Sequence, residues 1–181
     1  QGMGVVIGPD LVVTNAHVVA GSDTVTVTSA AGAVRNGVVV GFDPLRDLAL
    51  LDVAELDVAA LDLAAPQGGT GAAVLARGTT EDRQRDLVVA LDGSVVRTID
   101  IFISDIYGDG RYERRGLELA IDVKPGDSGA GVVDDLGNLV GVVFSSSRGQ
   151  DDVSYAVSAL EVEDLVTTRS DVPVDPGVCR P

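Results

Sequence analysis

The sequence contains no tryptophan, one histidine, one cysteine and only six other aromatic side chains, three phenylalanines and three tyrosines, among its 181 residues. One histidine and one cysteine supply too few ligands for the His/Cys clusters that hold zinc or another transition metal. We therefore expect the protein to use no metal and no other cofactor.

Cationic side chains are also scarce, with 13 Lys and Arg residues against 28 Asp and Glu residues and a net charge of −15. Contacts to phosphate groups need clustered Lys and Arg, so this balance argues against nucleic acid as a partner. An acidic surface instead favours solubility and disfavours acidic substrates.

Long hydrophobic runs are absent as well, since none approaches the roughly 18–20 apolar residues of a membrane span. We expect no membrane contact by this domain itself. The chain starts at Gln1 and shows no signal peptide, which suggests a processed piece whose targeting segment would lie upstream.

Short valine-rich runs separated by Gly, Asp and Asn are abundant and predict an all-β fold. Some runs alternate with period two, as half-buried strands do. The strands expected in a first lobe cover residues 4–8, 11–14, 24–28, 34–40 and 48–53.

Residues 55–71, rich in Ala, Asp and Gly, are expected to connect the first lobe to a second one. Charged loops are expected at 79–86 and 104–115. The strands expected in the second lobe cover residues 72–76, 87–91, 95–103, 117–123, 130–133, 139–144 and 153–157.

The end of the chain is predicted to be helical from Ser158, with Glu161 three residues later completing a capping box. We expect a single domain over residues 1–181. Its predicted parts are a first lobe at 1–54, a connection at 55–71, a second lobe at 72–157, a helix at 158–168 and a tail at 169–181.

A serine between glycines, in Gly126-Asp-Ser-Gly129, is the most informative feature of the chain. A serine hydroxyl becomes a nucleophile only when a base takes its proton and backbone donors hold the oxyanion. A glycine turn between two strands is the alternative interpretation of these residues alone.

A base and an acid precede Ser128, in the order His17, Asp47, Ser128. No basic residue other than arginine follows Ser128, which excludes the Ser-acid-His order of α/β-hydrolases. The His-Asp-Ser order is that of the chymotrypsin type. Asp43 competes with Asp47, but it precedes a proline and fits a turn, whereas Asp47 opens a buried apolar run.

Three motifs together resemble a chymotrypsin-fold (trypsin-like) serine protease of the HtrA/Deg branch: T-N-A-H-V-V at 14–19, D-L-A-L-L at 47–51 and P-G-D-S-G at 125–129. I-D-V-K-P-G-D-S at 121–128 and G-V-V-F at 141–144 are similar to those of actinobacterial, membrane-tethered MarP-like proteases. The resemblance covers nearly the whole chain.

The resemblance implies two six-stranded β-barrels, the first truncated at its N-terminus, with a C-terminal helix and an active site between the barrels. Ser128 would attack a peptide carbonyl, His17 would accept its proton and Asp47 would orient the imidazole. The N–H groups of Gly126 and Ser128 would form the oxyanion hole. The expected activity is that of a serine endopeptidase that forms an acyl-enzyme with protein or peptide substrates. A latent or pseudo-protease that binds proteins is the alternative, and an esterase or acyl transferase a third.

The resemblance also suggests specificity residues. Asp122, six residues before Ser128, would form the base of the S1 pocket, unless it serves only a loop hydrogen bond. Phe144, Ser145 and Ser146 would wall that pocket and pair with the substrate backbone as an added strand.

Relatives of the MarP-like type imply an extracytoplasmic location, periplasmic or secreted, with a membrane anchor upstream of this chain. They also imply a disulfide between Cys179 and an upstream cysteine; a free thiol on a frayed tail is the alternative. Because the sequence lacks an I-V-G-G start, Asp127 has no obvious new amino terminus to pair with, and zymogen activation by that route is not expected.

Overall fold

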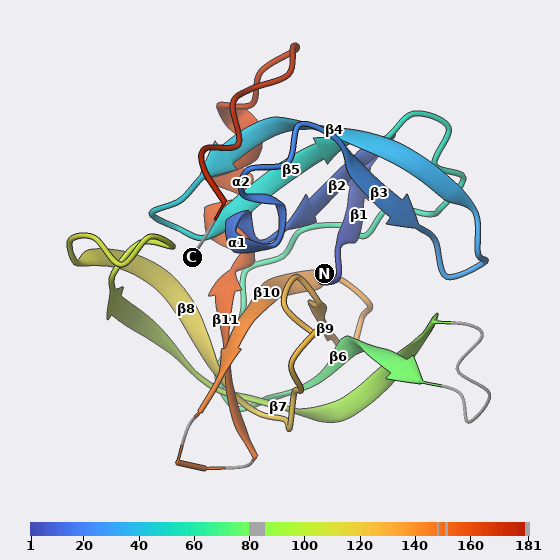
Figure 1. Cartoon of the computed structure of the whole chain (residues 1–181). Coiled ribbons are helices and arrows are strands. Elements are labelled where there is room, and N and C mark those ends of the chain that lie inside the picture. Colours follow the sequence, from blue (N-terminus) through green and yellow to red (C-terminus); the bar gives the residue numbers. More distant parts are fainter. Residues whose placement is uncertain (80–85, 148, 151, 180–181) are drawn as a thin grey trace.

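Two antiparallel β-structures, stacked one above the other in Figure 1, and two helices make up the fold. The computed structural model describes residues 1–79, 86–147, 149–150 and 152–179. Most of the charged loop predicted at 79–86 therefore lies outside the described residues. The all-β class predicted from the valine-rich runs is confirmed, and so is the C-terminal helix.

The first sheet contains the five strands that the sequence predicted for the first lobe, in the order β1-β2-β5-β4-β3. These strands are β1 (Val5–Gly8), β2 (Leu11–Thr14), β3 (Val25–Thr28), β4 (Val34–Asp43) and β5 (Leu48–Asp52). The central strand β5 is buried over Leu48–Leu51 because β2 and β4 flank it and the neighbouring elements cover it. A one-turn helix, α1 (Ala16–Val19), follows β2 directly.

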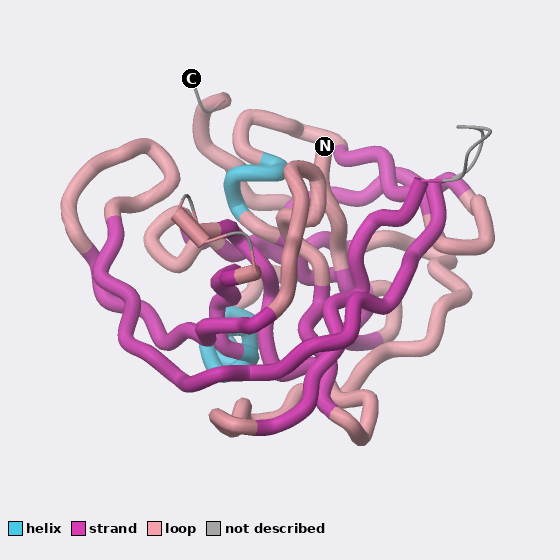
Figure 2. The backbone as a smooth tube through the Cα atoms, turned by 90° about the horizontal axis from the view of Figure 1, so that it is seen from below, coloured by secondary structure: helices cyan, strands magenta, loops and turns pink. Residues whose placement is uncertain are grey.

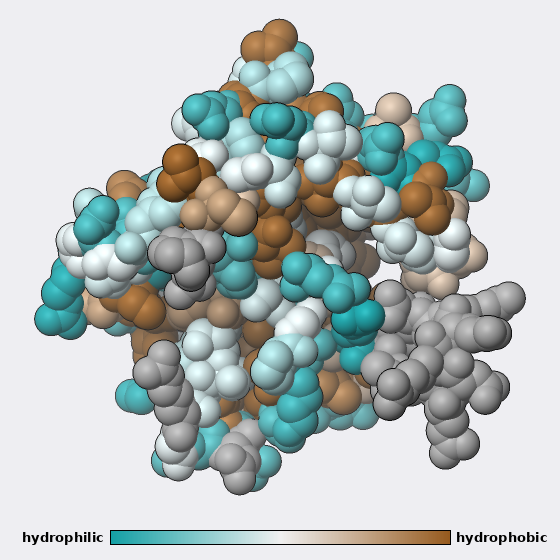
Figure 3. All heavy atoms as spheres, viewed as in Figure 1, coloured by the Kyte–Doolittle hydropathy of each residue, from teal (hydrophilic) through white to brown (hydrophobic). Residues whose placement is uncertain are grey.

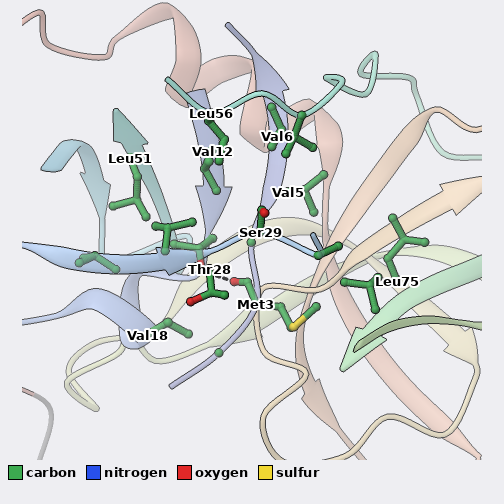
Figure 4. Close-up of a pocket in the computed structure, with 18 of the residues that line it drawn as sticks. Met3, Val5, Val6, Val12, Val18, Thr28, Ser29, Leu51, Leu56 and Leu75 are labelled. Atoms are coloured by element: carbon green, nitrogen blue, oxygen red, sulfur yellow. Dashed lines mark hydrogen bonds between the residues drawn. The ribbon is translucent and has the colours of Figure 1, made fainter. Parts of the chain in front are cut away.

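The first sheet is open, since its outer strands β1 and β3 are not paired with each other. It has five strands, one fewer than the six of a complete barrel of the expected type, which agrees with the predicted truncation. A pocket of about 340 Å³ lies at this opening and is lined mostly by aliphatic side chains. Figure 4 shows Val5, Val6 and Val12 on one side of the pocket and Leu75, from the second sheet, on the other.

The second sheet closes into a six-stranded barrel in the order β10-β11-β8-β7-β6-β9. Figure 2 shows its long, strongly curved strands from below. The strands are β6 (Thr70–Thr79), β7 (Asp86–Ile103), β8 (Tyr112–Ala120), β9 (Gly131–Asp134), β10 (Leu139–Ser146) and β11 (Val153–Ser158).

Two predictions for the second lobe were wrong: residues 112–115 of the loop predicted at 104–115 belong to β8, and residues 87–91 and 95–103 belong to a single 18-residue strand, β7. The prediction left residues 92–94 outside the strands, but Gly93 lies within β7. A Cβ atom there would lie 2.4 Å from the Ala120 carbonyl oxygen, so close packing of neighbouring strands explains the glycine. A register shift between Val95 and Arg97 lets β7 pair with β6 at one end and β8 at the other.

The C-terminal helix α2 (Ala159–Thr167) packs against β4 and β5 of the first sheet and against β8, β10 and β11 of the second. Ser158 caps it, accepting a hydrogen bond from the Leu160 N–H. The predicted capping box is wrong, because the Glu161 carboxylate faces two arginines instead of returning to Ser158.

Glu161 ties the two sheets together electrostatically. Its carboxylate, only 4% exposed, accepts from Arg46 Nε at 2.5 Å and from Arg115 Nε at 2.9 Å. Arg46 comes from the turn before β5 and Arg115 from β8. Burial opposes ionisation, but the hydrogen bonds from Arg115 and Arg46 prevail and hold the pKa of Glu161 below its usual range.

The surface seen in Figure 3 mixes hydrophilic residues with scattered hydrophobic ones. Within the described ranges, none of the helices has the length and apolar character needed to cross a membrane.

We predict that Glu161→Gln lowers the free energy of unfolding at pH 7 by about 2 kcal/mol. This is less than the 3–5 kcal/mol typical of broken buried pairs, because both arginines are more than 40% exposed. A folded-state pKa below the unfolded value of about 4.3 means that Glu161 stabilises the fold above that pH and loses this effect as the pH falls. Urea denaturation from pH 7 to pH 3 should therefore show the two proteins converging. Glu163→Gln, an exposed position on the same helix, is the matched control; an equal effect there would contradict the prediction.

Candidate active site

The Asp47 carboxylate, in the turn before β5, contacts His17 of α1 at two points, the imidazole ring and the backbone N–H. Asp47 Oδ2 lies 2.8 Å from His17 Nδ1, and Asp47 Oδ1 accepts the His17 backbone N–H at 3.0 Å. The carboxylate thus holds both the imidazole ring and the start of α1. Asp47 is 5% exposed, whereas His17 is partly accessible, so the pair presents its histidine to solvent.

The backbone at Asp47 is held in an uncommon conformation, with φ of +57°. A non-glycine residue adopts this left-handed region only when its surroundings impose it. Asn15, fully buried, donates from Nδ2 to the Asp47 carbonyl oxygen at 3.0 Å. Our sequence analysis did not single out Asn15; the available signal was its place in T-N-A-H-V-V, two residues before His17.

Asp43, the competing acid, lies in a turn. Its Oδ1 accepts the backbone N–H groups of Leu45 and Arg46, and its Oδ2 pairs with the Arg46 guanidinium. The structure therefore brings Asp47, and not Asp43, to His17.

Ser128 lies in the tight turn that the flanking glycines predicted. Gly126 and Gly129 have φ of +105° and +88°, conformations that favour glycine. The turn is closed by two backbone hydrogen bonds, from Asp127 N–H to the Lys124 carbonyl and from Ala130 N–H to the Asp127 carbonyl.

The N-terminal segment joins the serine turn to the first sheet. Met3 N–H donates to the Ser128 carbonyl at 2.7 Å, and the Met3 carbonyl accepts from Thr14 Oγ1 at 2.6 Å. A Cβ atom at Gly2 would lie 2.7 Å from both the Ser128 carbonyl oxygen and a Val18 methyl group. Gly2 therefore fits closely between the Ser128 carbonyl group and α1, the helix that carries His17.

The two predicted oxyanion-hole donors are unoccupied. Over the described residues, the N–H groups of Gly126 and Ser128 donate to no protein acceptor. The intervening Asp127 is buried, and its carboxylate accepts the backbone N–H groups of Arg77 at 2.9 Å and Lys124 at 2.8 Å. The sequence indicated no partner for Asp127; in the structure its partners are these two backbone N–H groups.

The Ser128 hydroxyl makes no hydrogen bond to His17 within the described part of the chain. Such bonds are often long in substrate-free enzymes and tighten when substrate binds. The structure nevertheless contains an oriented imidazole in α1, and a half-buried serine with two free backbone donors in a glycine turn, which are kinds of group that acyl transfer requires.

The expected specificity residues lie in two different settings. Asp122 is exposed, and its carboxylate forms an ion pair with Lys124. Phe144 is half-buried at a bulge in β10, while Ser145 and Ser146 are exposed. β9 pairs with β10 as far as Val142, and Gly129 and Ala130 bond the backbone of Val143, so among the described residues this edge of β10 is uncovered from Phe144 onwards.

Cys179, exposed and unbonded in this chain, lies against the end of α1. A Cβ atom at Gly21 would lie 2.6 Å from the Cys179 nitrogen, and the Gly21 N–H donates to the Pro176 carbonyl at 3.2 Å. The tail is therefore packed against the first sheet and not frayed.

The two stacked β-structures are those of the trypsin-like serine peptidase fold. Residues 2–142 match the model of the trypsin-like peptidase domain family, and the chain belongs to this family.

Known relatives are serine proteases. The chain is 36% identical over 181 residues to serine protease Rv3671c of Mycobacterium tuberculosis strain H37Rv, covering 99% of this chain and 45% of the relative. It is 28% identical over 161 residues to the Do-like serine protease HtrB of Bacillus subtilis, covering 86% and 34%. The chain thus spans less than half the length of these curated relatives.

The fold matches a solved relative closely. The crystal structure of the active form of the Rv3671c protease superposes with a TM-score of 0.87 at 35% sequence identity, covering 99% of this chain and 78% of that one. The resemblance to MarP-like and HtrA-type proteases inferred from the motifs is therefore confirmed.

We predict that Asp127→Ala destabilises the serine turn. The change leaves the N–H groups of Arg77 and Lys124 without their acceptor, which should lower the free energy of unfolding by about 2 kcal/mol. Asp127→Asn keeps one acceptor oxygen and should lose about half as much. Thermal unfolding of the three proteins measures both effects, and equal stability of Asp127→Ala and wild type would contradict the assignment.

Proposed function

We propose that the chain is a serine endopeptidase domain that hydrolyses peptide bonds through His17, Asp47 and Ser128. The observation that carries the proposal is the buried Asp47 carboxylate on His17 Nδ1, 2.8 Å away, which leaves Nε2 as the accepting nitrogen. Membership of a peptidase family and the proximity of Ser128 to α1 support it.

The chemistry follows from these positions. His17 takes the Ser128 hydroxyl proton as the oxygen attacks the substrate carbonyl, and the N–H groups of Gly126 and Ser128 stabilise the oxyanion. His17 then donates the proton to the leaving amine, which leaves an acyl group on Ser128. Water, deprotonated by the same histidine, hydrolyses this acyl-enzyme.

We propose that substrate pairs as an extended strand with the uncovered edge of β10 at Phe144, Ser145 and Ser146. The pairing on this edge of β10 ends at Val143, which supports this placement, because a peptide beyond it continues the sheet without displacing a strand. Proteins or peptides are then the substrate class. The relatives' names and motifs support an extracytoplasmic location, with any anchor outside this chain.

A latent protease or protein-binding module is the second candidate. The unmade hydrogen bond between Ser128 and His17 favours it. The oriented His17–Asp47 pair and the two free oxyanion donors favour an active enzyme, since a binding module needs neither.

We predict that a fluorophosphonate probe labels the wild-type protein at Ser128 and labels neither Ser128→Ala nor His17→Ala. Asp47→Asn should react about 10⁴-fold more slowly, because the amide favours the wrong imidazole tautomer. Intact-mass spectrometry after timed exposure gives the rates, and circular dichroism checks folding. A folded wild type that stays unlabelled would favour the binding module.

We further predict that acidification slows labelling, because a protonated base cannot accept the serine proton. The rate should be measured from pH 4 to pH 9. A flat profile down to pH 4 would contradict the role of His17.

The Asp122–Lys124 ion pair leads to a prediction on P1 preference. The ammonium of Lys124 neutralises the acid that would otherwise attract Lys or Arg at P1. Lys124→Ser should raise kcat/KM for basic over small apolar P1 residues about fivefold, the upper range for an exposed pair. Matched peptide pairs measure the ratio; no change would mean that Asp122 does not face the P1 side chain.

A further inference from the structure

The backbone of Asp47 is bonded to a buried side chain that the proposed catalytic steps do not use. Asn15, directly after β2, is fully buried, and its Nδ2 donates to the Asp47 carbonyl oxygen at 3.0 Å. The other polar atom of this amide, Oδ1, is buried without a hydrogen-bond partner among the described residues. Burying an amide with one polar atom unpaired is unfavourable. The donation to Asp47 is therefore the interaction that explains an asparagine at this position.

Capping of α1 does not explain Asn15. It is the N-cap residue of this helix, with φ of −79° and ψ of 148°, an extended conformation open to most residues. The side chain of an N-cap asparagine usually accepts the backbone N–H two or three residues further on, but the Asn15 side chain makes no such bond. Replacing this side chain thus removes no cap and strains no backbone.

The cap that Asn15 does not supply comes from Asp47. Asp47 Oδ1 accepts the backbone N–H of His17, the second residue of α1, where the side chain of an N-cap residue often bonds. Asn15 in turn holds the carbonyl group of Asp47. Each segment therefore holds the other: Asp47 caps the helix that carries His17, and the residue that begins this helix fixes the backbone of Asp47.

Asp47 needs such support because its backbone is in the left-handed region, with φ of +57°. A non-glycine residue keeps this conformation only where its surroundings impose it. On the N-terminal side of Asp47, Arg46 is already held by Asp43 and Glu161. Asn15 fixes the carbonyl side. A change in φ would rotate the Asp47 side chain relative to the turn and move its carboxylate away from His17.

We propose that Asn15 is a positioning residue for the catalytic acid: its amide keeps Asp47 in the left-handed conformation from which the carboxylate reaches both the imidazole and the backbone N–H of His17. The part of Asn15 in catalysis rests on the proposed peptidase function. The positioning of Asp47 against His17 does not, and it can be observed without substrate.

The variant Asn15→Leu isolates the amide donor. Leucine has nearly the shape of asparagine, and because Oδ1 has no partner and the side chain caps nothing, the change removes one hydrogen bond of the described residues. Asn15→Ala is the second variant. Asn138→Leu is the matched control, because Asn138 also donates from Nδ2, to the Asp134 carboxylate at 3.1 Å, in the hairpin between β9 and β10.

The reporter is the Nδ1–H proton of His17, the only histidine of the chain. Bonded to the Asp47 carboxylate, this proton should give a far-downfield, slowly exchanging NMR signal at one fixed, mildly alkaline pH. We expect both Asn15 variants to lose this signal or shift it upfield, and Asn138→Leu to keep it. Urea denaturation measures the stability of each variant separately, and a merely structural role of Asn15 would lower stability without moving the His17 signal.

Labelling of Ser128 by the fluorophosphonate probe should slow about 10²-fold in both Asn15 variants, the effect expected when a catalytic group is misplaced by about 1 Å. Asn138→Leu should react at the wild-type rate. The proposal would be overturned by an unchanged His17 signal in the folded Asn15 variants, by an equal change in Asn138→Leu, or by a wild type that lacks the signal.

If neither Asn15 variant folds, the wild-type protein still provides a test. The Asn15 side-chain amide protons should exchange slowly with solvent and show scalar coupling to the Asp47 carbonyl carbon across the hydrogen bond. An Asn15 amide that exchanges freely in the folded wild type would overturn the proposal.

The two readouts separate this proposal from the peptidase function. A wild type that is never labelled at Ser128, but whose His17 signal depends on Asn15, would refute the peptidase function and support the positioning role. A wild type that is labelled, with Asn15 variants that react equally fast and keep the His17 signal, would refute the positioning role alone.

Discussion

The contact between Asp47 and His17 is the interaction on which the rest of the site depends. One carboxylate accepts from the imidazole and from the backbone N–H of the same histidine, so ring orientation and helix start are fixed together. This requires an aspartate in a left-handed backbone conformation, stabilised by Asn15. The surrounding turn, in which Asp43 and Arg46 are bonded to each other, places Asp47 in that position.

Elements of the second barrel reach across to support this turn. Glu161 of α2 binds Arg46, the residue just before Asp47, while Ile106 binds the Pro44 carbonyl. Arg115 of β8 donates to Glu161, and its neighbour Arg114 is buried with its guanidinium over the Phe144 ring. Neighbouring residues of one strand thus meet different partners, a carboxylate of α2 and an aromatic ring of β10.

Much of this could be predicted because local rules and tertiary structure agree. Alternating valines specified the strands of the first sheet, and Gly126 and Gly129 specified a turn around Ser128. The continuity of β7 through Gly93 was not predicted, because it depends on close packing against a distant residue, Ala120. Glu161 fitted a capping box by spacing, but two arginines far away in sequence bind it more strongly. The surroundings of Arg114 depend on such long-range placement and left no pattern in the sequence.

Met3 is hydrogen-bonded to both Ser128 and Thr14, and this limits how the chain can vary in length. A Cβ atom at Gly129 would lie 2.0 Å from the Met3 carbonyl oxygen, so the segment and the serine turn meet without spare room. Ser128 and His17 lie beside different sheets, and this segment helps to set their separation. Insertions in the distant hairpins of the barrel leave the separation of Ser128 and His17 unchanged. A residue added between Gly2 and Val5 would instead shift the hydrogen bonds of Met3 and misalign the serine turn relative to the first sheet.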